Sequence, residues 1–281
     1  MEKTMESISE ILQYTNNKAM RHQAYHHYTD MESLIKIIES RSFLASTGFN
    51  MNDQLELSSG MKSRWENLYF TSFSYGNESI AMWGLYCFPR ESAVRISLPN
   101  KVMNSWIETL NSNSDIYYGI LGQKTKYLEP NKIKSILLTD ILYTDERHRY
   151  LSRGNYDKLK LDMPSEKIIQ LPEMTGHIKD GAWIAENEVR LLIETTEHYE
   201  SDVKLFSHFE NSLIRALRIT IGPWCDDQTY KLYVSKLVEL GVLEKNIARS
   251  KFTGLLKMKS PCDKCVYKTM ALKQKQPLTS H

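Results

Sequence analysis

Apolar positions recur at helical spacing in two stretches near the start of the chain. Residues 8–12 carry apolar side chains that predict a short amphipathic helix. In 31–41 the apolar side chains fall on one face at helical spacing, which predicts a second helix. Thr29 followed three residues later by Glu32 fits a capping box, so we expect this helix to begin at Thr29. The histidine-containing segment before it is then a strand or loop that leads into a helix.

Alternating or aromatic-rich stretches predict several strands among further helices. A short helix is expected over 79–86, and another from Asp226 or Asp227 to Leu240, where Gly241 ends it. The predicted strands are 43–46, 68–74, 93–98, 135–142, 188–194 and 217–221. Strands and helices alternate irregularly, without a regular βαβ order, which indicates an α+β fold.

Three polar groups interrupt these otherwise structural segments. His27 precedes the second helix, and hydroxyl side chains follow two aromatic residues in 68–74. Glu186, Glu188 and Arg190 open the strand 188–194, and residues two apart on a strand share a face. If that face borders a cleft, the carboxylates are placed to stabilise a cationic transition state.

Several short motifs follow one another in a fixed order along the chain. They are His27-Tyr28-Thr29-Asp30, Asn52-Asp53 with Glu56, Ser72-Phe73-Ser74, Ser79 through Met82-Trp83 to Tyr86, Trp183, Glu186-Asn187-Glu188-Val189-Arg190-Leu191 and Ile221-Gly222-Pro223. This ordered set resembles the bacterial family called domain of unknown function 2971, over roughly residues 27–257. That family is in turn similar to the ADP-ribosyltransferase fold, which implies one domain with a split, mainly antiparallel sheet clasping NAD in a cleft.

The resemblance implies a role for each end of this cleft. His27 and Thr29 would hold the adenosine-side ribose and the nicotinamide amide, with Tyr28 where the family fold has a small residue. Glu188 would be the catalytic glutamate, and Glu186 would position an acceptor. The remaining expected NAD-binding residues are Thr71, Ser72 and Ser74 in the nicotinamide pocket, Trp83 or Tyr86 as its aromatic wall, and Arg190, Arg21 or Arg64 for the phosphates.

Structural interpretations of the same residues remain open. His27 can be a capping or core histidine, and the hydroxyl strand can be an ordinary strand. Glu186, Glu188 and Arg190 can form a solvated strand face with an ion pair worth about 0–1 kcal/mol. Trp83 and Trp183 can be core residues. Cys262-x-x-Cys265 has half the ligands of a structural zinc site, and no second such pair is present, so no metal is expected.

The composition predicts a cytoplasmic protein. The 281 residues hold 36 Lys and Arg against 34 Asp and Glu, and no apolar run is long enough to span a membrane. Four cysteines do not indicate a secreted disulfide framework.

The charge is uneven along the chain, because 249–281 carries eight Lys or Arg and one acid, a net charge of +7. We therefore expect an N-terminal helical extension (1–20), an ADP-ribosyltransferase-like domain (21–257) and a basic tail (258–281).

Three functions compete at this point. The first is an NAD-dependent ADP-ribosyltransferase or NAD glycohydrolase that acts on an intracellular macromolecule. The family context implies a toxin or anti-phage defence effector, with an antitoxin or regulatory partner. The second is a non-catalytic module that senses a nucleotide or a partner. The third is a nucleic-acid enzyme whose basic tail tethers its substrate, which would make binding steeply salt-dependent.

Overall fold

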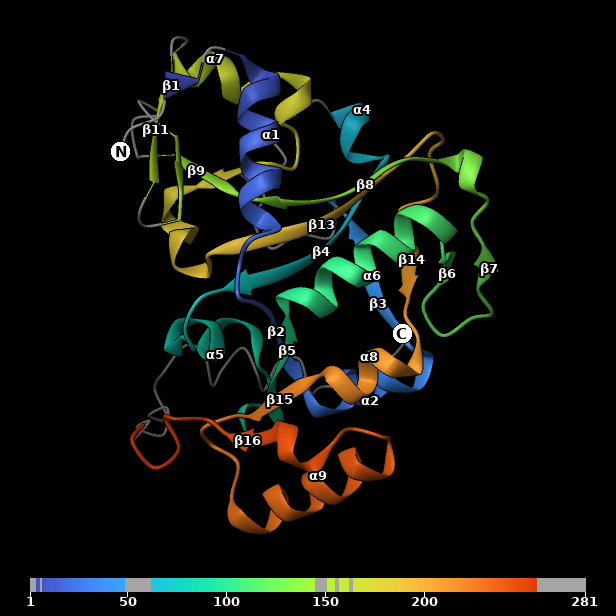
Figure 1. Ribbon diagram of the computed structural model, residues 1–281, viewed down its shortest axis with the longest axis vertical. Helices are drawn as coiled ribbons and strands as arrows, with labels where there is room; N and C mark the ends of the chain where they lie inside the picture. Colours follow the sequence, from blue (N-terminus) through green and yellow to red (C-terminus); the bar gives the residue numbers. More distant parts are fainter. Residues whose placement is uncertain are drawn as a thin grey trace, which may run out of the picture.

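The computed structural model describes residues 4–5, 7–48, 62–144, 151–154, 157–161 and 164–256 (Figure 1). The predicted 50–53 loop with Glu56, the tail 258–281 and the Cys262/Cys265 pair lie outside these residues. The helices are α1 (Ile8–Ala19), α2 (Met31–Ser40), α4 (Lys62–Trp65), α5 (Ile80–Tyr86), α6 (Asn100–Asn113), α7 (Ser165–Ile169), α8 (Asn211–Ala216) and α9 (Asp227–Glu239), with the 3-10 turn η5 (Gly181–Glu186).

Two sheets form the framework, in an α+β arrangement that is mainly antiparallel, as predicted. The smaller sheet has the order β1-β11-β10-β9-β12 and the larger β16-β15-β5-β2-β4-β3-β14-β6-β7, with β13 between β4 and β8. The strands are β1 (Thr4–Met5), β2 (Ala24–Asp30), β3 (Ser42–Thr47), β4 (Leu68–Tyr75), β5 (Ala93–Pro99), β6 (Ile116–Ile120), β7 (Lys126–Tyr127), β8 (Ile133–Asp140), β9 (Leu142–Thr144), β10 (Leu151–Arg153), β11 (Asp157–Leu161), β12 (Ile178–Asp180), β13 (Glu188–Thr195), β14 (Val203–His208), β15 (Arg218–Ile221) and β16 (Ile247–Arg249).

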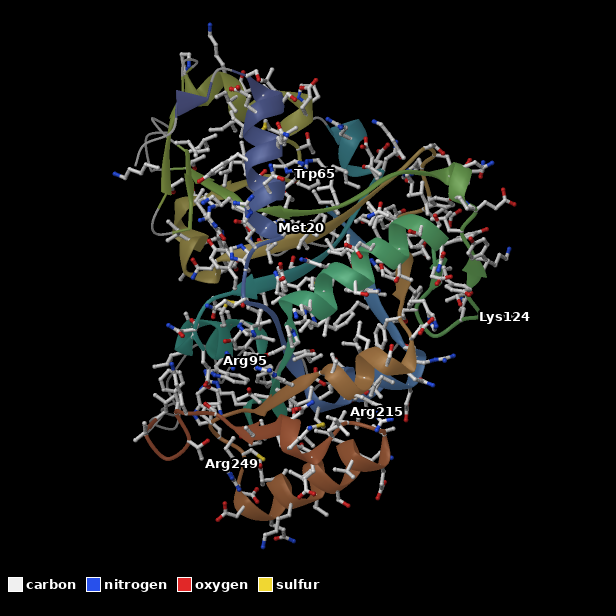
Figure 2. All side chains as sticks on the ribbon, viewed as in Figure 1. Met20, Trp65, Arg95, Lys124, Arg215 and Arg249 are labelled. Atoms are coloured by element: carbon white, nitrogen blue, oxygen red, sulfur yellow. The ribbon has the colours of Figure 1, made fainter. Side chains whose placement is uncertain are left out.

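The main core lies on one face of the larger sheet, where α2, α6 and α8 contribute buried apolar side chains. Figure 2 shows side chains throughout the described part of the chain, with Trp65 labelled in the upper half of the view and Arg249 in the lower part. Trp65 packs on Phe70, and Arg249 on edge strand β16 lies 3.9 Å from the ring centroid of Tyr230 in α9. A second apolar cluster joins α1 to the smaller sheet through Ile11, which is 2% exposed.

The predicted cap of the second helix is wrong by one residue. Asp30, not Thr29, caps α2, because its carboxylate accepts the backbone N–H of Ser33 at 2.8 Å. Thr29 lies one residue too early, because β2 continues through Asp30 and α2 begins only at Met31. The other predicted cap is confirmed, since Asp226 accepts the backbone N–H of Thr229 at the start of α9.

The predicted strand 135–142 is two strands in different sheets. β8 ends at Asp140 and pairs with β13, whereas β9 begins at Leu142 and pairs with β10 and β12. Between them the backbone N–H of Ile141 donates to the carbonyl of Glu188 at 3.0 Å. The chain therefore passes from one sheet to the other beside the start of β13.

None of the helices within the described ranges has the length and apolar character needed to cross a membrane.

Candidate functional site: a pocket where the sheet divides

The larger sheet divides along one edge of β4. The end of β4 pairs with β2 through His26 and Ser74, whereas its start pairs with β3 through Ser46 and Phe70. Between these pairings the ring Nδ1 of His27 lies 2.9 Å from the carbonyl oxygen of Ser72. β2 and β3 are thus both neighbours of β4, and they separate at Ser72.

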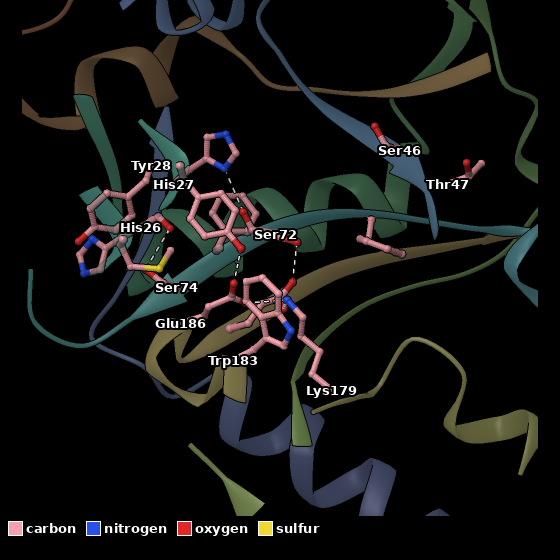
Figure 3. A pocket seen from close by; sticks show the side chains of 15 residues that line it. His26, His27, Tyr28, Ser46, Thr47, Ser72, Ser74, Lys179, Trp183 and Glu186 are labelled. Atoms are coloured by element: carbon pink, nitrogen blue, oxygen red, sulfur yellow. Dashed lines mark hydrogen bonds and ion pairs between the residues drawn. The ribbon is translucent and has the colours of Figure 1, made fainter. Parts of the chain in front are cut away.

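A pocket of about 220 Å³ opens at this division (Figure 3). Its walls come from both sheets and from α5. The lining residues are His26, His27, Tyr28, Ser46, Thr47, Phe70, Ser72, Phe73, Ser74, Met82, Tyr86, Lys179, Trp183, Glu186 and Glu188. Seven of the thirteen site residues expected from the sequence therefore meet in one pocket: His27, Tyr28, Ser72, Ser74, Tyr86, Glu186 and Glu188.

Glu188 is buried in the pocket wall and accepts from several donors at once. Its Oε1 accepts from the Ser72 hydroxyl at 2.6 Å and from Arg190 Nε at 2.8 Å. Its Oε2 accepts from the Arg190 guanidinium at 3.1 Å and pairs with Lys179 Nζ at 3.0 Å. A carboxylate has about four acceptor positions, so all those of Glu188 are filled.

These neighbours determine the ionisation of Glu188. Burial raises its pKa, but Arg190 and Lys179 outweigh that effect and hold the pKa well below its usual range. The carboxylate is therefore an anion at neutral pH.

Glu186 reaches the same pocket from a turn and not from the strand. It ends η5, and Asn187, with φ 45°, turns the chain into β13. The predicted shared strand face of Glu186 and Glu188 is therefore wrong, although the two side chains do line one pocket. Glu186 accepts a short hydrogen bond from the Tyr86 hydroxyl and pairs with Lys179 at 2.6 Å. Burial raises the pKa of Glu186, opposed by Lys179.

Lys179 joins the two carboxylates, and the sequence did not point to it. It lies on β12 of the smaller sheet, is 6% exposed, and its Nζ lies 5.1 Å from the ring centroid of Trp183. β12 has only three residues, too few for alternation to predict which face Lys179 occupies. Trp183 was expected in the family pattern, and the structure places it in the pocket wall.

His27 offers the pocket a neutral ring. Because the Ser72 carbonyl can only accept, Nδ1 of His27 carries the proton and Nε2 is the acceptor. Burial lowers the pKa of His27, opposed by the hydrogen bond to Ser72. A ring with a free acceptor suits a hydroxyl donor, such as that of a sugar, better than a phosphate.

His26 and Tyr28 also line the pocket, and their polar atoms have structural partners. His26 lies within hydrogen-bonding distance of the Ser97 hydroxyl and the Gly76 carbonyl, and burial together with Arg95 lowers its pKa to about 4. The Tyr28 hydroxyl accepts the backbone N–H of Ser79, the residue that caps α5. Both residues therefore hold the pocket wall in place.

Four expected NAD-binding residues do not line the pocket. Thr71 faces the core, where its hydroxyl donates to the Leu44 carbonyl, and Thr29 lies further along β2. Trp83 is fully buried and its indole N–H donates to Glu78. Arg190 is fully buried and occupied by Glu188 and the Gly176 carbonyl, so a direct contact with a phosphate is incompatible with its position.

The other phosphate candidates lie elsewhere. Arg64 donates to the Pro172 carbonyl and pairs with Glu194, and Arg21 lines a separate groove along α1. Within the described ranges, Lys179 is the one lysine or arginine in the pocket wall.

No family model and no curated protein matches the chain, so the resemblance to domain of unknown function 2971 stays a prediction. A solved structure, Thermus sp. 2.9 DarT in complex with NAD+, is similar at 10% sequence identity, covering 82% of this chain and 96% of that chain. Its TM-score is 0.35.

Proposed function

We propose that this pocket binds the nicotinamide end of NAD and breaks the bond between ribose and nicotinamide. ADP-ribose would pass to an intracellular macromolecule or to water. The observation that carries the proposal is Glu188, a buried carboxylate held as an anion in the wall of a pocket that contains a second carboxylate. The role of a toxin or anti-phage effector belongs to the same proposal.

The reaction needs a fixed anion near the sugar. As the bond between C1′ and the nicotinamide nitrogen breaks, its electron pair moves to that nitrogen and positive charge develops on the ribose, as in glycoside cleavage. A hydrogen bond from the ribose 2′-hydroxyl to Glu188 strengthens as this charge grows. Glu188 would therefore stabilise the transition state more than the bound substrate.

Other pocket residues have matching roles in this proposal. Glu186, with its raised pKa, would accept the proton of an attacking hydroxyl. His27 would accept from a sugar hydroxyl, and Ser72 would keep Glu188 oriented. Tyr86 and Trp183 would border the nicotinamide ring.

The size of the pocket fits part of a dinucleotide. Pockets for drug-sized ligands enclose about 300–1,000 Å³, whereas this one encloses about 220 Å³. It would therefore hold the nicotinamide and its ribose, with the adenosine half outside. Among the described residues, Lys179 is the one lysine or arginine in the pocket wall, and it is paired with both carboxylates, so in this proposal the phosphates would also lie outside the pocket.

The test is the release of nicotinamide from NAD by purified protein, compared with Glu188→Gln. We expect the variant to lose about 10²–10³-fold in turnover and to keep its NAD affinity within about threefold, because the amide preserves shape but not charge. Glu194→Gln is the matched control, since Glu194 lies on the same strand but pairs with Lys134 and Arg64 away from the pocket. Release that persists undiminished in Glu188→Gln would refute the role of Glu188.

One observation favours a non-catalytic binding module instead. All acceptor positions of Glu188 are filled, and Glu186, Glu188, Lys179 and Arg190 balance in charge, as in a structural ion-pair network. This alternative predicts nucleotide or partner binding without nicotinamide release in any condition. It also predicts that Glu188→Gln binds as the wild type does.

A further inference from the structure

Lys179 lies where the two carboxylates and an aromatic ring converge. Its Nζ is 2.6 Å from Glu186 Oε2 and 3.0 Å from Glu188 Oε2, with the Trp183 ring centroid at 5.1 Å (Figure 3). Two carboxylates and the face of an indole are the surroundings that a cation prefers. The site is therefore built around a positive charge, which Lys179 supplies.

The partners of Glu188 differ in how readily they can leave. Arg190 is fully buried, donates to the Gly176 carbonyl, and lies 4.5 Å from the Phe70 ring centroid. Lys179, in contrast, lines the pocket and reaches Glu188 through a flexible four-carbon stem. A ligand entering the pocket meets Lys179 and Ser72 before it meets Arg190.

We propose that the ammonium group of Lys179 occupies the position that a cationic ligand would take beside Glu188. Lys179 keeps the ligand away from Glu188 until the ligand displaces this ammonium group. The inference rests on the proposed function in one respect: the entering cation is the positively charged nicotinamide ring of NAD. When it enters, Lys179 gives up Glu188 and keeps Glu186, so the buried lysine is never left unpaired. Glu188 thereby regains the acceptor position that a ribose hydroxyl needs.

Competition between Lys179 and a ligand should depend on the charge of the ligand. Lys179 repels a cation in the pocket and occupies one of its binding positions. A neutral ligand of the same shape meets only the occupied space. Removal of the ammonium group should therefore strengthen cation binding much more than binding of the neutral analogue, whereas a purely structural lysine would affect both ligands alike.

The test compares binding of 1-methylnicotinamide, which is a cation, and of nicotinamide, which is neutral, by calorimetric titration of the full chain at pH 7. We expect Lys179→Met to bind the cation about tenfold more tightly than the wild type, with nicotinamide changed by less than about twofold. Lys179→Arg is the matched control, because it keeps the charge and should not gain this preference. Equal changes for both ligands, or no gain for the cation, would overturn the proposal.

A second variant covers the case in which Lys179→Met does not fold. Lys179→Met combined with Glu186→Gln removes one positive and one negative charge and keeps the Glu188 and Arg190 pair. It should still bind 1-methylnicotinamide more tightly than the wild type, because the ammonium no longer occupies Glu188, and weaker or equal binding would refute the proposal. Nicotinamide release from NAD is measured separately, so a chain that prefers the cation but cleaves no NAD would refute only the proposed function.

Discussion

At the scale of single residues, Arg190 was predicted to contact a phosphate, but in the structure it holds Glu188 in place. The guanidinium is fully buried and makes two contacts to Glu188, one on each carboxylate oxygen. Such paired contacts fix both the distance and the plane of the carboxylate. Arg190 is therefore a positioning residue for Glu188.

Two buried histidines, His26 and His177, and the half-buried His27 make the stability of the protein sensitive to mild acid. Burial lowers the pKa of His27, of His26 to about 4 and of His177 to about 3, the last two with help from nearby arginines. The unfolded chain binds these protons near pH 6.5 and the folded chain does not. The free energy of unfolding should therefore be highest above pH 6.5 and fall as the pH drops from 6.5 to 4.

His26→Asn is the test of this pH dependence. Between pH 7 and 4, urea unfolding should show a loss about 3 kcal/mol smaller in the variant than in the wild type, because one of the histidines no longer titrates. The exposed His198, replaced in the same way, serves as control and should leave the pH dependence unchanged. An unaltered loss in His26→Asn would contradict the assignment of a neutral His26.

At the scale of elements, the turn between η5 and β13 brings the two carboxylates together. Asn187 has φ 45°, a region that asparagine and glycine adopt readily and β-branched residues do not. Its backbone N–H donates to the carbonyl of Ile184, and its own carbonyl accepts the N–H of Tyr75 at the end of β4. The conformation of one residue therefore sets the position of Glu186 relative to Glu188.

Substitutions at Asn187 should separate this geometry from general stability. We expect Asn187→Gly to retain nicotinamide release and Asn187→Val to lose most of it, with about 1–2 kcal/mol of stability lost through strain. Arg41, with φ 51° at the end of α2, provides the control. Arg41→Val should cost similar stability in urea unfolding and leave release intact; an active Asn187→Val would show that the turn does not control the site.

Much of this arrangement was predictable from local patterns, and part of it was not. The alternation in 188–194 predicted β13, but it left open whether Glu188 and Arg190 border a cleft or form a solvated face, and the structure buries both side chains. Their burial depends on β4 and β8, which flank β13 on both sides, and pairing between distant strands leaves no local signal. Lys179 was not predicted for the same reason, since its partners Glu186 and Glu188 become its neighbours only when the two sheets pack together.

At the scale of the whole molecule, the site is shared between two sheets. Lys179 comes from the smaller sheet and Glu188 from the larger. Asp140, fully buried, ties the two together by pairing with His22 before β2 and with Arg153 on β10. The packing of the smaller sheet therefore bears directly on the pocket.

The N-terminal helix should accordingly contribute to global stability. Ile11 is 2% exposed among side chains of the smaller sheet, so Ile11→Ala should lower the free energy of unfolding by about 2–5 kcal/mol in urea titrations. Gln13→Ala, on the exposed face of the same helix, should change it by less than about 0.5 kcal/mol. If Ile11→Ala were as mild as this control, the helix would be a peripheral extension, as the domain prediction has it.

The strands that form the pocket at β4 leave the ribosome at different times, because they lie far apart in the chain. Ser72 and its partner Glu188 are 116 residues apart in the chain, a stretch that ribosomes translate in roughly 6 to 23 s at about 5–20 residues per second. During that interval a nascent chain already contains β2, β3 and β4 but lacks the strand that carries the anion. Any activity of this pocket therefore begins only after β13 has left the ribosome.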